Sequence, residues 1–212
     1  MFSPFQALCP LVLASSSPRR QEFLRDMGLA FTCVCPLGSE PAPLPGEDPA
    51  VYAQRAADGK SLTVAKAQPD AVVIGADTVV ALEHRIFGKP RNAAHALHML
   101  KALCGCTHTV ISALCVVFPA RNQNPQKIIR LHRATAVTFH AWPENLLAAY
   151  VATGEPMDKA GAYAIQGQGA FLVESIHGSW SSVVGLPLTE LLQLLWEENS
   201  IGTATLPALK ML

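Results

Sequence analysis

Continuous apolar runs along this chain predict buried strands. The runs at 11–14 and 71–77 are continuous and short, which is typical of strands covered on both faces, and 78–82 extends the second run. Two longer strands are predicted at 107–118 and 128–139. The segment between those two is polar and rich in Asn and Pro, so it favours a β-hairpin.

Helix-spaced apolar residues occupy much of the remaining chain. They predict helices at 51–67, 92–103, 144–153 and 186–198, where one face of each segment is apolar. Strands and helices mixed in this way predict an α/β fold with a mixed sheet.

Three segments show neither pattern. The segment 36–49 holds five of the sixteen prolines and is predicted to be a loop. Residues 161–176 are rich in glycine and are expected to form short strands. Residues 199–212 are expected to form a loosely ordered tail.

Half of the residues are apolar, which is enough for a sizeable core. No break in composition divides the chain. We therefore expect one domain over residues 1–212, with its core at about 11–196 and a tail at 197–212.

Charge and cysteine usage exclude several classes of protein. Sixteen basic and sixteen acidic residues cancel, so no bulk field attracts nucleic acid or an anionic membrane. No apolar run is long enough to span a bilayer, and the first ten residues lack the Lys or Arg of a signal peptide. Four of the six cysteines form C-x-C pairs, not zinc-type C-x-x-C pairs, so we expect thiols in a reducing cytoplasm.

The run SSSPRR at 15–20 lies between a predicted strand and a predicted helix. Unpaired N–H groups at a helix start favour a phosphate, and arginines add bidentate donors for its oxygens. Alternatively, Ser17 is only an N-cap, with Pro18 at the first helical position. Capping explains the Ser-Pro pair but not the two arginines, and both interpretations stay open on these residues alone.

Four further pieces carry functional groups. Asp77 ends a predicted buried strand, so it is a candidate metal ligand or general base, or else a turn cap. GKPR at 88–91 places two cations on a turn that could instead be a solvated loop, and Lys60 alone would be a surface lysine. The segment 154–167 holds two acids, a lysine, a tyrosine and a glutamine among glycines, which favours a function.

Together these groups supply cations for a polyphosphate and carboxylates for a divalent metal such as Mg²⁺. The chain has no Walker A sequence, no G-x-G-x-x-G and no G-x-S-x-G. A P-loop ATPase, a dinucleotide-binding fold and an elbow nucleophile are therefore not indicated.

Six motifs in order resemble the Maf family of nucleoside triphosphate pyrophosphatases, first known as septum-formation inhibitors. They are LASxSPRR from Leu13, GADTVV from Gly75, GKP from Gly88, THxV from Thr107, EPxDKAGAYxIQG from Glu155 and VVGLPL from Val183. The resemblance covers about 11–196. It implies an elongated mixed sheet with helices forming two lobes around a deep cleft, like the inosine-triphosphate pyrophosphatases, and a homodimer.

The resemblance also implies a reaction and the residues for it. A nucleoside triphosphate would be hydrolysed to the monophosphate and pyrophosphate with a divalent cation, Mg²⁺ or Mn²⁺. Asp77 would be the proton acceptor and would lie close to the metal, with Glu40 as a second metal-linked acid and Glu47 as the alternative. The positions that match the family's phosphate-binding residues are Ser15, Arg19, Arg20, Lys60 and Lys89.

The branch of the family can also be identified by resemblance. Members that prefer dTTP and UTP carry G-A-D-T and I-Q-G, and this chain has both, so Arg19, Thr78 and Gln166 match the specificity positions. A glutamine amide can donate and accept at once, which suits the O4/N3–H edge of uracil or thymine. The family usually has an acid where this chain has Asn92, which caps a helix equally well.

Several alternatives remain at this stage. The substrate could include modified pyrimidine nucleotides, or the same reaction could act on 7-methylguanosine triphosphate. A non-catalytic nucleotide-binding regulator of cell division is a rival of another class, although a pure binder has no need of Asp77 as a base.

Overall fold

A mixed seven-stranded sheet forms the centre of the molecule. The computed structural model describes residues 3–36, 38, 41–120 and 125–204. The strands are ordered β3-β2-β4-β6-β7-β8, and β5 pairs with β4 beside that path. β2 is parallel to β3 and to β4, whereas the other pairs are antiparallel, which confirms the predicted α/β class with a mixed sheet. The strands are β2 (Leu11–Leu13), β3 (Thr32–Cys33), β4 (Val72–Leu82), β5 (Arg85–Phe87), β6 (Thr107–Phe118), β7 (Lys127–Phe139) and β8 (Val173–His177).

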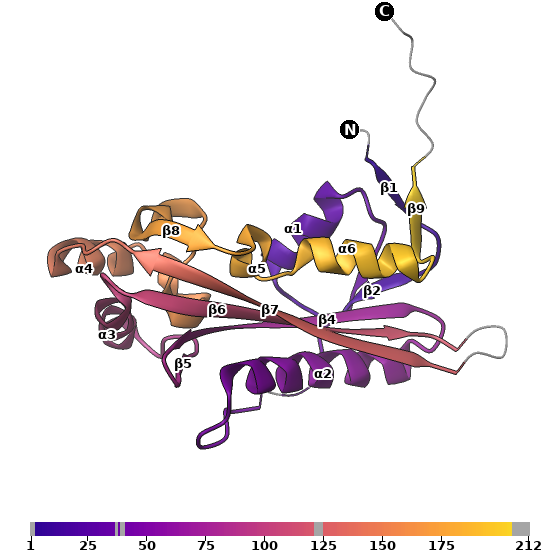
Figure 1. The fold of residues 1–212 in the computed structure, drawn as a ribbon, viewed down its shortest axis with the longest axis horizontal. Coiled ribbons are helices and arrows are strands. Elements are labelled where there is room, and N and C mark those ends of the chain that lie inside the picture. Colours follow the sequence, from indigo (N-terminus) through magenta and orange to yellow (C-terminus); the bar gives the residue numbers. More distant parts are fainter. Residues whose placement is uncertain (1–2, 37, 39–40, 121–124, 205–212) are drawn as a thin grey trace, which may run out of the picture.

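Three long strands run along the longest axis of the molecule (Figure 1). β6 and β7 form the predicted hairpin, and β4 pairs antiparallel with β6. In that pairing Asp77 lies opposite Ala113, and Thr78 lies opposite Ser112. Directly opposed residues share a face of the sheet, and neighbours along a strand alternate. Thr78 and Ser112 therefore point to one face, and Asp77 points to the other.

Helices cover both faces of the sheet (Figure 1). On one face α2 packs against alternate residues of β4 and β6, and on the other α1 and α6 pack against the intervening residues. A third apolar cluster joins α3, α4 and the short 3₁₀ helices at the end of the sheet that carries β8. The helices are α1 (Pro18–Asp26), α2 (Pro49–Ala67), α3 (Ala93–Leu103), α4 (Glu144–Ala152), α5 (Trp180–Val184), α6 (Leu188–Glu197), η1 (Glu155–Asp158), η2 (Ala160–Ala162) and η3 (Gly167–Leu172).

The four predicted helices at 51–67, 92–103, 144–153 and 186–198 are confirmed as α2, α3, α4 and α6, each within two residues at either end. Asn92 caps α3, because its side-chain oxygen accepts the backbone N–H of His95 at 2.8 Å. That position therefore keeps its capping function without an acid.

Two predictions for the second half of the chain are wrong. Half of the segment 161–176 is 3₁₀ helix, and β8 is its one strand, because Gly161 and Gly167 adopt left-handed angles that suit tight turns. The segment 199–212 is not all loose, since β9 (Ile201–Thr203) pairs antiparallel with β1 (Phe5–Ala7). Residues 205–212 lie outside the described part.

The predicted loop at 36–49 contains no strand among its described residues, and α2 begins at its last residue, Pro49. Among the described helices, none combines the length and the hydropathy needed to cross a bilayer.

Candidate active site

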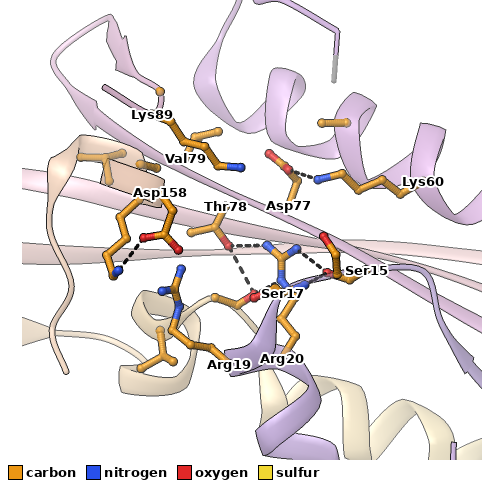
Figure 2. Close-up of a pocket in the computed structure, with 18 of the residues that line it drawn as sticks. Ser15, Ser17, Arg19, Arg20, Lys60, Asp77, Thr78, Val79, Lys89 and Asp158 are labelled. Carbon is orange, nitrogen blue, oxygen red and sulfur yellow. Dashed lines mark hydrogen bonds and ion pairs between the residues drawn. The ribbon is translucent and has the colours of Figure 1, made fainter. Parts of the chain in front are cut away.

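A cleft of about 700 Å³ brings together the predicted site residues (Figure 2). Apart from the alternative acid Glu47, every one of them that the structure describes lines this cleft, namely Ser15, Arg19, Arg20, Lys60, Asp77, Thr78, Lys89 and Gln166. Glu40 lies outside the described residues. The residues come from the start of α1, from α2, β4 and the turn after β5, and from the segment before η3.

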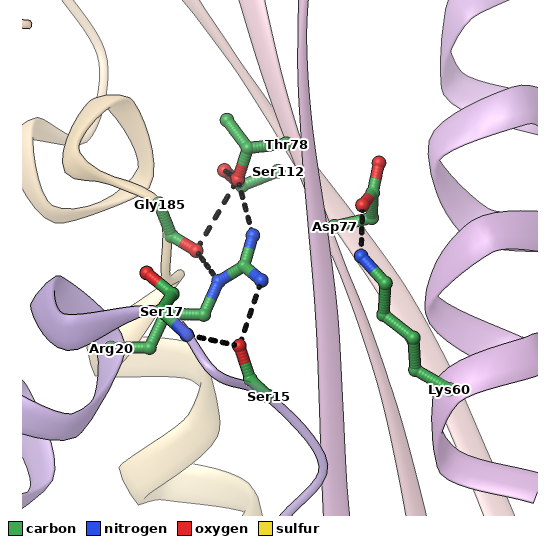
Figure 3. A network of polar contacts seen from close by, with 8 residues as sticks. All are labelled: Ser15, Ser17, Arg20, Lys60, Asp77, Thr78, Ser112 and Gly185. Carbon is green, nitrogen blue, oxygen red and sulfur yellow. Dashed lines mark hydrogen bonds and ion pairs between the residues drawn. The ribbon is translucent and has the colours of Figure 1, made fainter. Parts of the chain in front are cut away.

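The cleft lies where the edge of β4 has no strand neighbour. β2 pairs with β4 only as far as Ile74, and β5 pairs with it only from Val80. Between these two points the chain leaves β2 and enters the turn that begins α1. The gap lets one cleft reach Asp77 and Thr78, although the two side chains point to opposite faces of the sheet (Figure 3).

Asp77 forms an ion pair with Lys60 across the interface of β4 and α2. The Lys60 ammonium lies 2.5 Å from the Asp77 carboxylate, and the two side chains are only 17% and 7% exposed. The surface-lysine interpretation of Lys60 is therefore wrong. The Lys89 ammonium points toward the same carboxylate from the opposite side in Figure 2.

Gly75 sets how closely α2 approaches this strand. A Cβ atom at Gly75 would lie 2.2 Å from the Ser61 hydroxyl and 3.0 Å from the Ala57 carbonyl. The first contact is not possible without a shift of Ser61, and the second is tighter than side chains normally allow, so glycine permits this separation of helix and strand. Lys60 is the residue before Ser61 on α2, and Asp77 lies two residues after Gly75 on β4. The close approach of helix and strand at Gly75 therefore also brings Lys60 and Asp77 together.

On the other face of β4, Arg20 is held by side chains and a carbonyl (Figure 3). Its Nε donates to the Gly185 carbonyl at 2.8 Å, its Nη1 to Ser15 Oγ at 3.3 Å and its Nη2 to Thr78 Oγ1 at 3.1 Å. The side chain is buried, so the guanidinium is fixed before any ligand arrives.

The hydroxyls beyond Arg20 form a chain whose direction follows from counting protons. Ser112 Oγ lies 2.6 Å from the Ser182 carbonyl, which can only accept, so Ser112 donates there. Thr78 Oγ1 lies 2.7 Å from Ser112 Oγ and 3.3 Å from the Gly185 carbonyl, so its one proton is directed mainly at Ser112, the shorter contact. Thr78 is left as the acceptor for Arg20. Sequence reasoning missed Ser112, because a serine inside an apolar strand carries no motif signal.

Ser15, and not Ser17, supports the turn that begins α1. Ser15 Oγ accepts the Ser17 backbone N–H at 3.1 Å as well as the Arg20 guanidinium. Ser17 occupies the N-cap position before Pro18, as predicted, but its hydroxyl makes no capping hydrogen bond. The capping interpretation is therefore correct for the position and wrong for the side chain.

The cleft is strongly cationic although the whole chain is neutral. Its described lining includes five cations, Arg19, Arg20, Lys60, Lys89 and Lys159, against two carboxylates, Asp77 and Asp158. A hydrogen bond from Lys159 holds the pKa of Asp158 below its usual value, and the charge of Arg19 adds to this effect. A cleft with this balance attracts a polyanion.

The second candidate acid, Glu47, is occupied elsewhere. Arg55 binds it with two hydrogen bonds of 2.7 and 2.8 Å, and this pairing lowers the pKa of Glu47 to about 2. Glu47 is not among the described residues that line the cleft. Its contacts join the loop before α2 to that helix.

The donor set fits a cation that is shared with a ligand. Within the described residues, no three metal-ligating side chains gather at one place. Mg²⁺ commonly binds one or two carboxylates and completes its shell with substrate phosphates and water. The carboxylate of Asp77 in a cleft for a polyanion matches that arrangement.

Fold and site together define an α/β protein with a cation-lined cleft around a buried carboxylate. The chain belongs to the Maf family, since the model described as "Maf-like protein" matches residues 10–198. It is 59% identical over 189 residues to a dTTP/UTP pyrophosphatase of Oleidesulfovibrio alaskensis, covering 89% of this chain and 85% of that protein. Proteins of the same name from Nitratidesulfovibrio vulgaris and Aquifex aeolicus are 52% and 43% identical, covering 93% and 91% of this chain and 92% and 97% of their own lengths.

Proposed function

We propose that this chain hydrolyses dTTP and UTP to the monophosphate and pyrophosphate. The observation that carries the proposal is the buried Asp77 carboxylate in a cleft with five cations, in a chain whose relatives are named dTTP/UTP pyrophosphatase. Cations alone would suit a binding protein. A carboxylate among them supplies the base that hydrolysis needs.

Asp77 orients a water molecule and accepts its proton as the water oxygen attacks the α-phosphorus. The bond from that phosphorus to the bridging oxygen breaks, and pyrophosphate leaves with the electron pair. Lys60 holds the carboxylate in place through the 2.5 Å contact. Such reactions rely mainly on positioning and on charge stabilisation.

The cations of the cleft hold the phosphates. Arg20 is fixed in advance by three hydrogen bonds, so little ordering is needed when it binds an oxyanion. Arg19, Lys60 and Lys89 complete the set, and Ser15 fixes the turn. A divalent cation, Mg²⁺ or Mn²⁺, would be held by Asp77 and the substrate phosphates, with Glu40 as the second acid expected from the sequence, and would offset phosphate charge.

Gln166 is proposed to recognise the base. It lines the cleft and precedes η3, and its amide can pair with the O4/N3–H edge of uracil or thymine. The Thr78 hydroxyl is engaged with Arg20 and Ser112, so Thr78 acts on specificity through the position of Arg20. Arg19 is the third specificity position by resemblance.

Fold detail, assembly and location are proposed on the same family basis. We infer the elongated two-lobed architecture of the inosine-triphosphate pyrophosphatases, with the cleft between the lobes, and a homodimer. All six cysteines are free thiols, which supports a reducing cytoplasm. The balanced charge of the chain argues against nucleic acid as a partner.

A substrate panel tests the reaction directly. The purified protein is incubated with Mg²⁺ or Mn²⁺ and one nucleotide at a time, and pyrophosphate release is measured. The nucleotides are dTTP, UTP, CTP, GTP and the triphosphates of 5-methyluridine, pseudouridine and 7-methylguanosine. Strong release from dTTP and UTP supports the proposal. Preferred release from 7-methylguanosine triphosphate would move the chain to the other branch, and no release with either metal would favour a binding or regulatory protein.

A further inference from the structure

Glu155 binds the segment that carries Gln166, although Glu155 itself does not line the cleft. Its Oε1 accepts hydrogen bonds from the Tyr150 hydroxyl and from the Gly169 backbone N–H, both at 2.9 Å. Its Oε2 accepts the Gln168 backbone N–H at 2.9 Å. One carboxylate therefore joins the end of α4 to the first turn of η3.

These contacts replace a cap that Gln166 does not provide. Gln166 is the N-cap residue of η3, yet its side chain makes no capping hydrogen bond. The first N–H groups of a helix have no partner within the helix and need an outside acceptor. Because Glu155 accepts two of them, the Gln166 amide is left to face the cleft that it lines.

The glycines after Gln166 are required for this approach. Gly167 has φ +70°, and a Cβ atom there would lie 2.8 Å from Glu155 Oε2. A Cβ atom at Gly169 would lie 2.4 Å from the Tyr150 hydroxyl oxygen. The Q-G-x-G spacing thus matches a carboxylate and a phenol packed directly against the main chain.

The Glu155 carboxylate is ionised in the folded protein. Partial burial works to raise the pKa of Glu155, but hydrogen bonds from Gln168, Gly169 and Tyr150 hold it below its usual value. Hydrogen bonds to an ionised acceptor are stronger than those between neutral groups. The turn after Gln166 is therefore held more firmly than a neutral cap would hold it.

We propose that Glu155 is a positioning residue for base recognition, which fixes the turn after Gln166 so that the glutamine amide meets the edge of the pyrimidine. This inference rests on the proposed function of Gln166. It separates the cleft into two parts. The Glu155 carboxylate contacts Tyr150, Gln168 and Gly169, whereas the residues proposed to bind the phosphates lie on other elements. A cation of the cleft lining, Lys159, donates to the Glu155 main-chain carbonyl at 2.6 Å. Loss of the carboxylate should therefore harm base discrimination and spare triphosphate binding.

Glu155→Gln tests this with a side chain of the same shape. Its amide nitrogen must face a backbone N–H or the tyrosine, so at least one of the three hydrogen bonds is lost. We expect the ratio of kcat/KM for UTP over CTP to fall by about tenfold, mainly through a higher KM for UTP. The inhibition constant of inorganic triphosphate should stay within about twofold, since that probe has no base.

Two companion variants guard against a folding defect. Tyr150→Phe removes only one of the three hydrogen bonds, so it should lower the same ratio by a smaller factor. Glu144→Gln removes an exposed carboxylate of α4 that pairs with Lys101, and it should leave the ratio unchanged. An unchanged ratio in Glu155→Gln would overturn the inference, as would a parallel loss of triphosphate binding in that variant.

Gln166→Ala in the same assay separates this inference from the proposal beneath it. If Gln166→Ala leaves the ratio at the wild-type value, base recognition by Gln166 is wrong, and the role of Glu155 falls with it. If Gln166→Ala lowers the ratio but Glu155→Gln does not, only the role of Glu155 is overturned. When each variant alone lowers the ratio, the double variant should lower it little further than Gln166→Ala does, because both substitutions remove the same interaction with the base.

Discussion

At the scale of single residues, two neighbours on β4 divide the site between them. Asp77 points to the face covered by α2, where Lys60 holds it, and Thr78 points to the face where Arg20 is fixed. A strand places adjacent side chains on opposite faces, so two adjacent letters of the G-A-D-T motif contact different parts of the molecule.

Asp77→Asn should lower kcat by about 10²–10⁴-fold, because the amide cannot accept the proton of the attacking water. Binding of a nucleotide should be largely spared, since the phosphates are held by other residues. Steady-state kinetics and a titration of bound nucleotide measure the two effects. Asp70→Asn, in the exposed turn before the same strand, is the matched control, and near-wild-type turnover in Asp77→Asn would refute the assignment of the base.

Ser112→Ala should lower the free energy of unfolding by about 1–2 kcal/mol, because the buried Ser182 carbonyl loses its donor. It should also raise the KM for UTP, since Thr78 loses its partner and holds Arg20 less firmly. Urea denaturation and kinetics measure these changes. Thr107→Ala, on an exposed threonine pair of the same strand, should change both much less. Equal effects from the two variants would contradict the role of the hydroxyl chain.

At the scale of elements, the contact of α2 with β4 governs the ion pair. Two glycines near this contact have opposite surroundings. Gly75 faces the Ser61 hydroxyl and the Ala57 carbonyl, whereas a Cβ atom at Gly59, within α2, would meet nothing within 4 Å. The same substitution should therefore have opposite consequences at the two positions.

Gly75→Ala should lower the free energy of unfolding by about 1–3 kcal/mol through overpacking, and it should lower activity by moving Lys60 from Asp77. Gly59→Ala should raise the free energy of unfolding by about 0.5–1 kcal/mol, because alanine is the better helix former. Urea denaturation of both variants measures the pair of effects. Stabilisation by Gly75→Ala would show that helix and strand are not in close contact there.

Elements with a strong local signal were predictable, and those set by distant partners were not. The strands β4 and β6 follow from apolar runs, and α6 follows from its apolar face. By contrast, η3 depends on Glu155, which lies twelve or more residues earlier in the chain, and β9 depends on β1 at the other terminus. Neither partner can be recognised from local periodicity.

The site was predictable for a different reason. Most of its residues lie in short motifs that resemble a family, and, apart from the alternative acid Glu47, the structure places every described one at a single cleft. Ser112 was missed, because a serine in an apolar strand has many ordinary explanations. Glu155 lies in one of the motifs, but its role could not be predicted, because it depends on the atoms that the carboxylate contacts.

At the scale of the whole molecule, a buried histidine links stability to pH. His108 on β6 is 2% exposed, and its Nε2 lies 2.8 Å from the Tyr163 hydroxyl. Burial lowers the pKa of His108 to about 4. The folded protein keeps this ring neutral, whereas the unfolded chain binds a proton at its ordinary pKa of about 6.5.

The free energy of unfolding should therefore fall as the pH drops from about 6.5 to about 4, with this residue contributing roughly 3 kcal/mol. The sign follows because the unfolded state binds the proton that the folded state excludes. Urea denaturation at several pH values measures the slope. His108→Gln should make that slope shallower, and His98→Gln, on the exposed side of α3, should not. Identical slopes in all three proteins would contradict a buried neutral His108.

The pairing of β1 with β9 also has a consequence for the order of folding. The two strands come from opposite ends of the described chain, and Gln6 lies opposite Gly202. The entropic cost of closing a loop grows with its length, so the contact of β1 with β9 is costly until the central sheet has formed. The hairpin of β6 and β7 needs only a short closure and should form early, whereas the terminal strands should join last and exchange their amide hydrogens first.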